Sequence, residues 1–334
     1  MTFTKSSVSD EIKIKLLTMM MKTRATEERI VALYRQGKIV GGVYTGRGIE
    51  ATTVGAALAL EEQDFLFPIH RDLGAHLAKG QTVLNILLQY LGRGNSLTKG
   101  KDSGIHVSDS RLNIIGNVSH LGAMIPVAVG AGLGKRMLGE SIVAMNFIGE
   151  GGSNIGDFHE GLNFAAVQKA PFVLIIENNQ YAYSTPTHKG YTCEKLSDRA
   201  IGYGIPGFQV DGNRAVEVYS VVKDAVERAR HGQGPSLIEC VTMRMTGHSA
   251  HDDAFYVDKK RLEEFERKDP IFCLQRQLEK EGLVTPAALA AIEKALAEEI
   301  DAATETALAS PLPEPEWAAM GVYAERFDRQ AHGS

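Results

Sequence analysis

The chain is poor in cysteine. Its 334 residues include three cysteines, Cys193, Cys240 and Cys273, which are far apart and form no CxxC pair. Three such cysteines fit neither the disulfide framework of a small secreted domain nor a zinc site built on CxxC pairs. Cysteines left unpaired in this way suggest a reducing compartment.

Long apolar runs and basic blocks are also missing. No uninterrupted apolar stretch approaches the roughly 20 residues that a membrane span needs. Residues 1–15 lack the apolar core of a signal peptide. The formal net charge is -5, without a long basic block, which argues against nucleic-acid binding. We therefore expect a cytoplasmic protein with no membrane and no nucleic-acid partner.

Strand-like and helix-like segments alternate through most of the chain. Strands are expected at 64–67, 141–148, 171–176, 208–210 and 236–243, and helices at 50–60, 122–138, 158–168 and 215–230. This alternation is typical of βαβ units. It predicts an α/β fold, a doubly wound parallel sheet with helices on both faces.

Helical segments are expected before and after the α/β domain in the sequence. Residues 1–40 form an N-terminal helical segment in which a helix begins near Ser9, and residues 41–258 form the α/β domain. Residues 259–334 form a C-terminal helical arm, whose longest helix has Thr285 as N-cap and Pro286 at its first position. Residues 92–118 read as a long structureless loop, which is usually functional.

Two loops carry the strongest chemical signal. Glu150 lies in the glycine-rich run Gly149–Gly152 after one strand, and Asn179 lies in the amide-rich run Glu177–Tyr181 after the next. Ligands of doubly wound sheets bind outside the carboxyl ends of the strands. A carboxylate, an amide oxygen and backbone N–H groups suit a Mg²⁺-diphosphate, although both residues could instead be ordinary loop caps.

Arg71 and His248 also follow predicted strands. A guanidinium binds phosphate bidentately, so Arg71 is a candidate diphosphate clamp, with a salt bridge to Asp72 or Glu61 as the alternative. His248 could hydrogen-bond phosphate and stabilise a reaction intermediate, or it could be structural. The charged residues after it, 251–253, are expected to form a mobile, solvated loop.

Two nucleotide-binding patterns are only formal matches. Gly94–Lys101 resembles a P-loop, but its glycine spacing is too long by one and Asp102 replaces the required Ser or Thr. Gly202, Gly204 and Gly207 match a dinucleotide fingerprint without the strand that should precede it.

The sequence resembles a known family. The segment Gly149–Gly151 with Asn178 and Asn179 matches the thiamin-diphosphate motif. From about residue 29 to about residue 327, the chain resembles the alpha subunit of the decarboxylating dehydrogenase component of 2-oxo acid dehydrogenase complexes. The similar stretches are residues 44–51, 67–72, 99–101, 105–106, 119–126, 182–187, 210–213 and 247–249.

The resemblance implies a cofactor site for thiamin diphosphate and Mg²⁺. The metal ligands would be Glu150, Asn179 and the backbone carbonyl of Tyr181. The remaining implied cofactor-binding residues are His70, Arg71, Ser119, Leu121, Gly151, Gly152 and His248, and His248 would also be catalytic.

The resemblance also implies a reaction and partners. The reaction is decarboxylation of a 2-oxo acid and transfer of the acyl group to the lipoyl arm of a partner acyltransferase. A beta subunit would complete an α2β2 heterotetramer and supply the glutamate that activates the cofactor, leaving Glu50 a structural or interface residue.

Alternative functions stay open at this point. Glu150 and residues 182–187 slightly favour a branched-chain substrate over pyruvate. An acetoin dehydrogenase alpha subunit is an alternative, and a non-catalytic nucleotide-binding module is an alternative of another class. Ser249 matches a position that is phosphorylated in mitochondrial relatives, but we expect no such regulation here.

Overall fold

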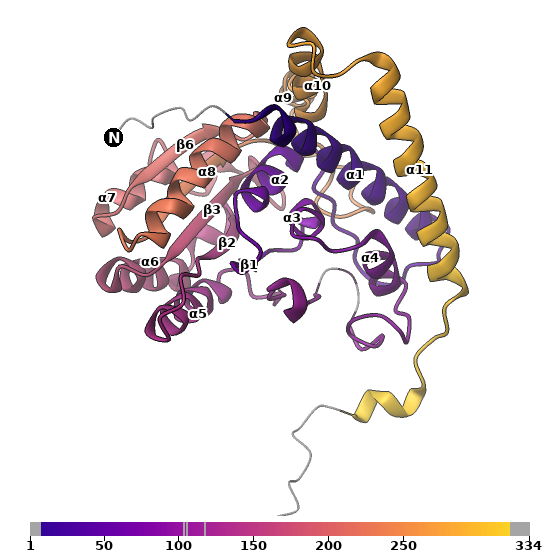
Figure 1. The fold of residues 1–334 in the computed structure, drawn as a ribbon, viewed down its shortest axis with the longest axis horizontal. Helices are drawn as coiled ribbons and strands as arrows, with labels where there is room; N and C mark the ends of the chain where they lie inside the picture. Colours follow the sequence, from indigo (N-terminus) through magenta and orange to yellow (C-terminus); the bar gives the residue numbers. More distant parts are fainter. Residues whose placement is uncertain (1–7, 103, 105, 117, 321–334) are drawn as a thin grey trace, which may run out of the picture.

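A five-stranded parallel sheet forms the centre of the molecule (Figure 1). The structure is a computed structural model that describes residues 8–102, 104, 106–116 and 118–320. The strands are β1 (Phe65–Phe67), β2 (Ala144–Gly149), β3 (Phe172–Asn178), β6 (Gly207–Asp211) and β7 (Ser236–Val241). They lie in the order β1-β2-β3-β7-β6, and every neighbouring pair is parallel.

Helices occur close to each of the predicted ranges 50–60, 122–138, 158–168 and 215–230, and further helices lie outside these ranges. The helices are α1 (Asp10–Arg35), α2 (Glu50–Leu58), α3 (Leu73–Ala78), α4 (Val83–Tyr90), α5 (Met124–Met137), α6 (Gly156–Gln168), α7 (Arg199–Tyr203), α8 (Ala215–Arg230), α9 (Lys259–Glu266), α10 (Pro270–Lys280) and α11 (Pro286–Ala309). The predicted N-cap Thr285 and the predicted helix start near Ser9 are confirmed, because the two side chains accept hydrogen bonds from the backbone N–H groups of Ala288 and Ile12.

Helices cover both faces of the sheet, so the predicted doubly wound α/β fold is confirmed. One hydrophobic cluster joins α2 and α8 to the strands, with Val218 and Val222 packed on Ile175. A second cluster joins α5 and α6 to the opposite face, around Phe158 and Phe172. All residues of β3 are buried, as expected for a central parallel strand.

The C-terminal helices pack against the N-terminal part of the chain. Ile300 and Ala307 of α11 share a core with Ile30 and Leu33 of α1 and with α4, and α11 runs along the outside of the molecule in Figure 1. Leu274 and Leu278 of α10 pack against α1 and α2. The predicted helical arm is therefore present and anchored, whereas the three-part division of the chain stays a prediction.

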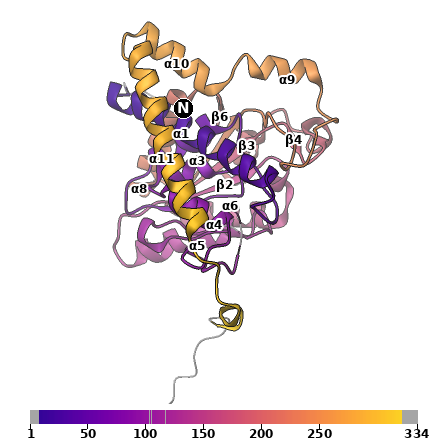
Figure 2. The same cartoon turned by 90° about the vertical axis from the view of Figure 1, so that its right-hand side faces the viewer.

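A small hairpin, which we did not predict, follows β3. It consists of β4 (Tyr181–Ala182) and β5 (Thr185–Pro186). Two non-glycine residues in this segment have a positive φ, Gln180 at 80° and Tyr183 at 55°. Helix α9 lies on the same side of the molecule as β4 (Figure 2), where its Phe265 packs with Tyr181. Strained backbone of this kind is common at functional sites.

Two loop predictions can now be compared with the structure. The 92–118 segment is not structureless, since it contains a 3-10 turn at Ser110–Leu112 and a bridge between Ile114 and Leu66; residues 103, 105 and 117 lie outside the described residues. Gly204 ends α7 at a φ of 67° and Gly207 begins β6, so the rejection of a dinucleotide fingerprint is confirmed.

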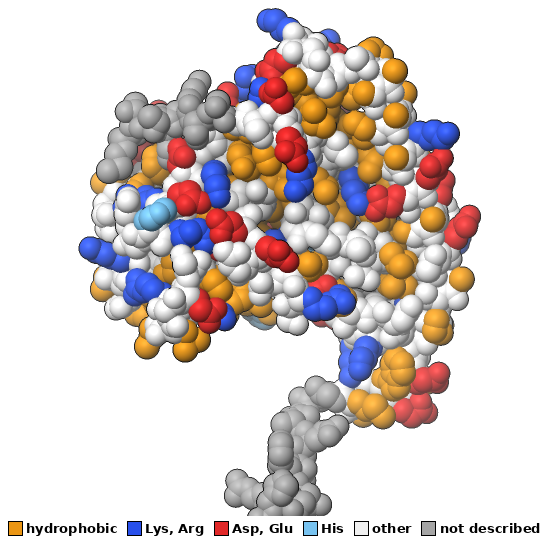
Figure 3. All heavy atoms as spheres, viewed as in Figure 1, with side chains coloured by type: hydrophobic (Ala, Val, Ile, Leu, Met, Phe, Trp, Pro, Cys, Tyr) orange, Lys and Arg blue, Asp and Glu red, His pale blue; other side chains and the backbone are white. Residues whose placement is uncertain are grey.

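The surface carries charges of both signs. In Figure 3, Lys and Arg side chains are interspersed with Asp and Glu on the face shown, and hydrophobic side chains gather around α10 and the start of α11. Within the described ranges, no helix is both long and apolar enough to cross a membrane.

Candidate functional site

The carboxyl ends of four strands bring the predicted site residues to one edge of the sheet. Arg71 follows β1, Glu150 follows β2, Asn179 and Tyr181 follow β3, and His248 lies beyond β7. Strands β1 to β3 run in chain order, whereas β6 and β7 approach from the other edge, so the order reverses between β3 and β7. Open α/β sheets bind ligands at such a reversal.

Glu150 and Asn179 present two buried oxygens at this edge. The Oε2 atom of Glu150 accepts a hydrogen bond from the backbone N–H of Asn179 at 3.2 Å. Glu150 Oε1 and Asn179 Oδ1 are buried and have no donor among the described residues. Leaving such an acceptor unpaired costs about 1–3 kcal/mol. Burial also raises the pKa of Glu150 to about 7, as expected for a carboxyl that lacks its counter-ion.

The carbonyl of Tyr181 is held by Arg244, a residue that was not predicted from the sequence. Arg244 Nη1 donates to the Tyr181 backbone oxygen at 3.1 Å, and the backbone N–H of Arg244 donates to the backbone oxygen of Asn179 at 3.2 Å. A carbonyl oxygen has two lone pairs, so the Tyr181 oxygen keeps one for another partner. Arg244 thus fixes the loop that carries both predicted ligands.

Arg71 is buried without a carboxylate partner in the described structure. It is 3% exposed and donates to the backbone oxygens of Thr45 at 3.1 Å and His248 at 2.7 Å. The alternative salt bridge to Asp72 or Glu61 is not formed: Asp72 accepts from the Ile69 N–H instead. Burial, together with the nearby Arg244 charge, lowers the pKa of Arg71 to about 10, which leaves it cationic at neutral pH.

Arg244 is a second buried cation of this kind. It is 3% exposed, and its guanidinium also donates to the Tyr183 oxygen at 2.8 Å and the Tyr256 hydroxyl at 3.0 Å. Its position shortly after β7 is the same signal that indicated His248, so the sequence could have revealed it. Two buried guanidinium groups bonded to uncharged oxygens and an imidazole nitrogen leave positive charge available for an anion.

His248 is held as a neutral imidazole. Burial, followed by the charges of Arg71 and Arg244, lowers the pKa of His248 to about 4. Its Nδ1 lies 3.1 Å from Arg71 Nη2. Because a guanidinium can only donate, Nδ1 accepts this bond and the ring proton is on Nε2. His248 therefore offers an Nε2–H donor at neutral pH.

The segment after His248 is more ordered than predicted. Asp252 accepts hydrogen bonds from the backbone N–H of His248 at 2.6 Å, from the Ala254 N–H at 2.9 Å and from the Tyr256 hydroxyl at 2.6 Å. The expectation of a mobile, solvated loop is wrong for Asp252, because its carboxylate holds the turn that presents His248.

Gly151 and Gly152 lie where a side chain would not fit. A Cβ at Gly151 would be 2.4 Å from Ala182 Cβ, and one at Gly152 would be 2.6 Å from Ile148 Cδ1. These glycines lie between β2 and α6, where a 3-10 turn at Gly152–Asn154 precedes the start of α6 at Gly156. Their backbone remains open to a close approach.

Polar and aromatic groups border this edge. The ring of Tyr44 lies 5.3 Å from that of His70 and 5.4 Å from that of His248. Ser119 is exposed and its hydroxyl lies 3.1 Å from His106 Nε2. Leu121 packs beside Gly152. The structure therefore brings His70, Ser119 and Leu121 toward the same edge, with Tyr44 as an additional wall.

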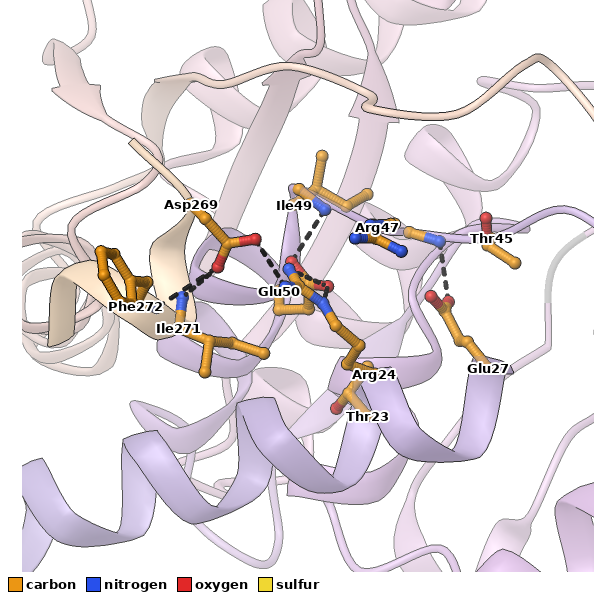
Figure 4. Close-up of polar contacts among 12 residues, drawn as sticks. Thr23, Arg24, Glu27, Thr45, Arg47, Ile49, Glu50, Asp269, Ile271 and Phe272 are labelled. Carbon is orange, nitrogen blue, oxygen red and sulfur yellow. Dashed lines mark hydrogen bonds and ion pairs between the residues drawn. The ribbon is translucent and has the colours of Figure 1, made fainter. Parts of the chain in front are cut away.

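Glu50 lies elsewhere, in a buried ion pair. Its Oε1 is 2.7 Å from Arg24, and Glu50 is 0% exposed. In Figure 4 the two side chains meet between α1 and the start of α2. Glu50 is thus enclosed, which agrees with a structural role.

The site combines oxygen ligands with buried positive charge. In the part of the chain that the structure describes, no three His, Cys, Asp or Glu side chains gather as a metal cluster. One carboxylate with amide and carbonyl oxygens suits a hard cation that takes further ligands from a phosphate. The two unpartnered oxygens and the buried arginines fit a metal-bound diphosphate.

Comparison with known proteins assigns the family. The model described as "Dehydrogenase E1 component" matches residues 18–316. The chain belongs to the dehydrogenase E1 component family. It is 40% identical to the 2-oxoisovalerate dehydrogenase subunit alpha of Bacillus subtilis (strain 168) over 325 residues, covering 95% of this chain and 97% of that protein.

Further relatives of this E1 chain carry other substrate names. The alpha subunit of the acetoin:2,6-dichlorophenolindophenol oxidoreductase of Bacillus subtilis (strain 168) is 35% identical and covers 95% of each chain. The pyruvate dehydrogenase E1 component subunit alpha of Staphylococcus aureus (strain Mu50 / ATCC 700699) is 36% identical, covering 83% of this chain and 72% of the relative. The predicted resemblance to E1 alpha subunits is confirmed, and the substrate type is not settled by these names.

Proposed function

We propose that this E1 chain is the alpha subunit of a 2-oxo acid dehydrogenase that binds thiamin diphosphate and Mg²⁺. The observation that carries the proposal is the pair of buried, unpartnered oxygens on Glu150 and Asn179 beside two buried arginines. A bound divalent cation satisfies both oxygens, and a diphosphate neutralises the arginines.

Each residue has a distinct task in this proposal. Glu150, Asn179 and the Tyr181 carbonyl hold the metal, and Arg71 clamps the diphosphate. The N–H groups of Gly151 and Gly152 approach it closely, while His70, Ser119 and Leu121 line the cofactor. The cofactor supplies the electron sink for decarboxylation of a 2-oxo acid. The acyl group that remains is transferred to the lipoyl arm of an acyltransferase.

His248 acts as a hydrogen-bond donor in this account. Its ring is neutral, with the proton on Nε2, because Arg71 occupies Nδ1. Asp252 holds the His248 backbone at 2.6 Å and so fixes the ring's position. An imidazole that keeps its proton over the neutral range can donate to an oxygen of the cofactor or substrate without titrating.

A beta subunit completes the site. Glu50 is enclosed by its ion pair with Arg24, which supports the proposal that the carboxylate activating the cofactor comes from another chain. The assembly is then a heterotetramer of two alpha and two beta chains. The free cysteines support a cytoplasmic location.

The substrate is a 2-oxo acid, with branched-chain acids slightly favoured by Glu150 and by similarity to a 2-oxoisovalerate dehydrogenase subunit. Acetoin is the second candidate, because an acetoin oxidoreductase subunit is similar over 95% of this chain. The test is dye reduction by the chain reconstituted with its cognate beta chain, using 2-oxoisovalerate, pyruvate and acetoin in turn.

We expect turnover with a 2-oxo acid from the pair and none from the isolated chain. Full activity of the isolated chain would contradict the proposed partnership. Turnover with acetoin alone would replace the 2-oxo acid by the second candidate.

A further inference from the structure

One peptide group links a buried glutamate of α1 to Arg71. The oxygen of this group, that of Thr45, accepts a hydrogen bond from Arg71 Nη1 at 3.1 Å. Its N–H, that of Gly46, donates to Glu27 Oε1 at 2.7 Å. Glu27 and Arg71 are therefore joined through the two ends of a single planar unit.

Glu27 is placed for this contact by α1. In Figure 4 its side chain leaves α1 and points toward the loop between Thr45 and Arg47. Glu27 is 4% exposed, and it lines a cavity of about 250 Å³ together with Thr45, Arg47 and Thr246. Among the described residues, its second oxygen, Oε2, has no hydrogen-bond partner.

The loop between Glu27 and Arg71 has little room to move. A Cβ at Gly46 would lie 2.5 Å from the Arg71 backbone oxygen. The Thr45 and Thr246 hydroxyls are 3.2 Å apart, and the Met245 N–H donates to the Arg47 oxygen at 3.0 Å. A change at Glu27 is thus transmitted to the Thr45 oxygen instead of being absorbed by the loop.

Arg71 depends on this peptide for its orientation. Among the described residues, its other side-chain hydrogen bonds both go through Nη2, to Nδ1 and the backbone oxygen of His248, and its guanidinium carbon lies 5.7 Å from the centre of the Tyr44 ring. The Thr45 oxygen is the partner that fixes Nη1, so it sets the plane in which the guanidinium presents its donors. A planar fork binds phosphate well only in one orientation.

The protonation state of Glu27 suits a residue that positions the Gly46 peptide better than one that pairs with a charge. Burial, followed by the nearby Glu50, raises the pKa of Glu27 to about 8, against the opposing effects of the Gly46 N–H and of Arg24 and Arg71. At neutral pH the side chain is therefore largely an uncharged acid. It can hold the Gly46 N–H without neutralising Arg71, which keeps its charge for an anion.

We infer that Glu27 is a positioning residue for the diphosphate clamp, acting on Arg71 through the peptide between Thr45 and Gly46. The inference depends on the proposed function, since it concerns how Arg71 meets a diphosphate. A role limited to holding α1 against the loop would change stability and leave the affinity of the folded protein unchanged.

The test compares Glu27→Met with Glu27→Gln in the full chain assembled with its beta chain. Methionine has a similar length without an acceptor, whereas glutamine keeps the oxygen that the Gly46 N–H needs. Binding of thiamin diphosphate with Mg²⁺ is measured by calorimetry, and kcat at saturating cofactor by dye reduction. The control is Glu11→Met, at an exposed glutamate in the first turn of α1.

We expect Glu27→Met to raise the Kd about tenfold, with kcat at saturation within about threefold of wild type. Glu27→Gln and Glu11→Met should leave the Kd within about twofold. In an Arg71→Ala background, adding Glu27→Met should cause no further weakening, because the residue acts through Arg71.

An unchanged Kd in Glu27→Met, or effects that multiply in the Arg71→Ala background, would overturn the inference. If Glu27→Met does not assemble, Glu27→Asp, which is one methylene too short, decides it: a wild-type Kd there overturns the inference and a raised Kd supports it. Failure of the wild-type assembly to bind thiamin diphosphate would instead contradict the proposed function.

Discussion

Asn179 occupies a position that stability alone does not explain. The amide is 6% exposed, yet its Oδ1 has no donor among the described residues. A residue selected only for packing would be apolar here, because an unpaired buried acceptor costs about 1–3 kcal/mol. The arrangement is understandable if a cation satisfies that oxygen in the working protein.

Asn179→Leu separates these two roles. The change removes the unpaired acceptor, so the free energy of unfolding of the chain in urea should stay within about 1 kcal/mol of wild type or rise. Binding of thiamin diphosphate in the presence of Mg²⁺ should weaken at least about tenfold in the assembly with the beta chain. A large loss of stability together with unchanged binding would show that the amide is structural.

His76 gives the chain a sensitivity to acid. It is 1% exposed, both ring nitrogens lack a partner in the described structure, and burial lowers its pKa from 6.5 to about 4. As the pH falls, His76 is therefore protonated in the unfolded chain before it is protonated in the folded chain. The free energy of unfolding should drop by roughly 3 kcal/mol between pH 6.5 and pH 4 through this group alone.

His76→Leu should remove most of that dependence. Urea unfolding of wild type and variant at pH 7.5, 6 and 5 measures it, with His188→Leu at an exposed position as the control. We expect the variant to be at least as stable as wild type at pH 7.5 and to lose less stability on acidification. Parallel pH profiles for the two proteins would contradict the assignment.

At the residue scale, many of the site residues could be predicted from where they stand in the sequence. Arg71, Glu150, Asn179 and His248 were placed from their positions after strands, and parallel strands necessarily bring their carboxyl ends together. Arg244 carries the same positional signal, but its role as the partner of the Tyr181 carbonyl depends on side-chain orientation. Such orientation is set by tertiary packing, which local patterns do not encode.

At the scale of elements, Asp269 ties two distant helices together. It caps α10 by accepting from the N–H groups of Ile271 and Phe272, and it pairs with Arg24 of α1 at 2.5 Å. Figure 4 shows Arg24 between Asp269 and Glu50. One carboxylate thus secures the start of α10 and its attachment to the core.

Substitutions at Asp269 should resolve the two contributions. Asp269→Asn keeps the N-cap of α10 and loses the charge pair with Arg24, so the free energy of unfolding in urea should fall by about 1 kcal/mol. Asp269→Ala loses both, so the free energy of unfolding should fall by about 2–3 kcal/mol. Asp258→Ala, which removes the N-cap of α9, is the control and should cost about 1 kcal/mol. Equal losses for Asp269→Asn and Asp269→Ala would mean that the cap contributes nothing.

Most helices and the strands of the main sheet were predictable, whereas the small hairpin was not. The bounds of α8 and α11 were predicted from amphipathic spacing and capping residues, which are local properties. The β4–β5 hairpin was missed because its strands are two residues each and its positive φ values fall on Gln180 and Tyr183 instead of glycine. That geometry is imposed by contacts with Arg244 and α9.

At the scale of the whole molecule, the alternation of strands and helices was enough to predict the layered α/β architecture. Alternation does not encode which strand lies beside which, so the order β1-β2-β3-β7-β6 emerged only from the structure. That order matters for function, because the reversal between β3 and β7 places Arg244 and His248 opposite Glu150 and Asn179.

The most direct test of the account is calorimetric titration of thiamin diphosphate into the chain assembled with its beta subunit, once with Mg²⁺ and once with a chelator. The account predicts binding with Mg²⁺ and a Kd at least about tenfold weaker with the chelator, with that difference absent in Asn179→Leu. Binding that is indifferent to Mg²⁺, or no binding by the assembled wild-type protein, would contradict the assignment of this edge of the sheet as a metal-diphosphate site.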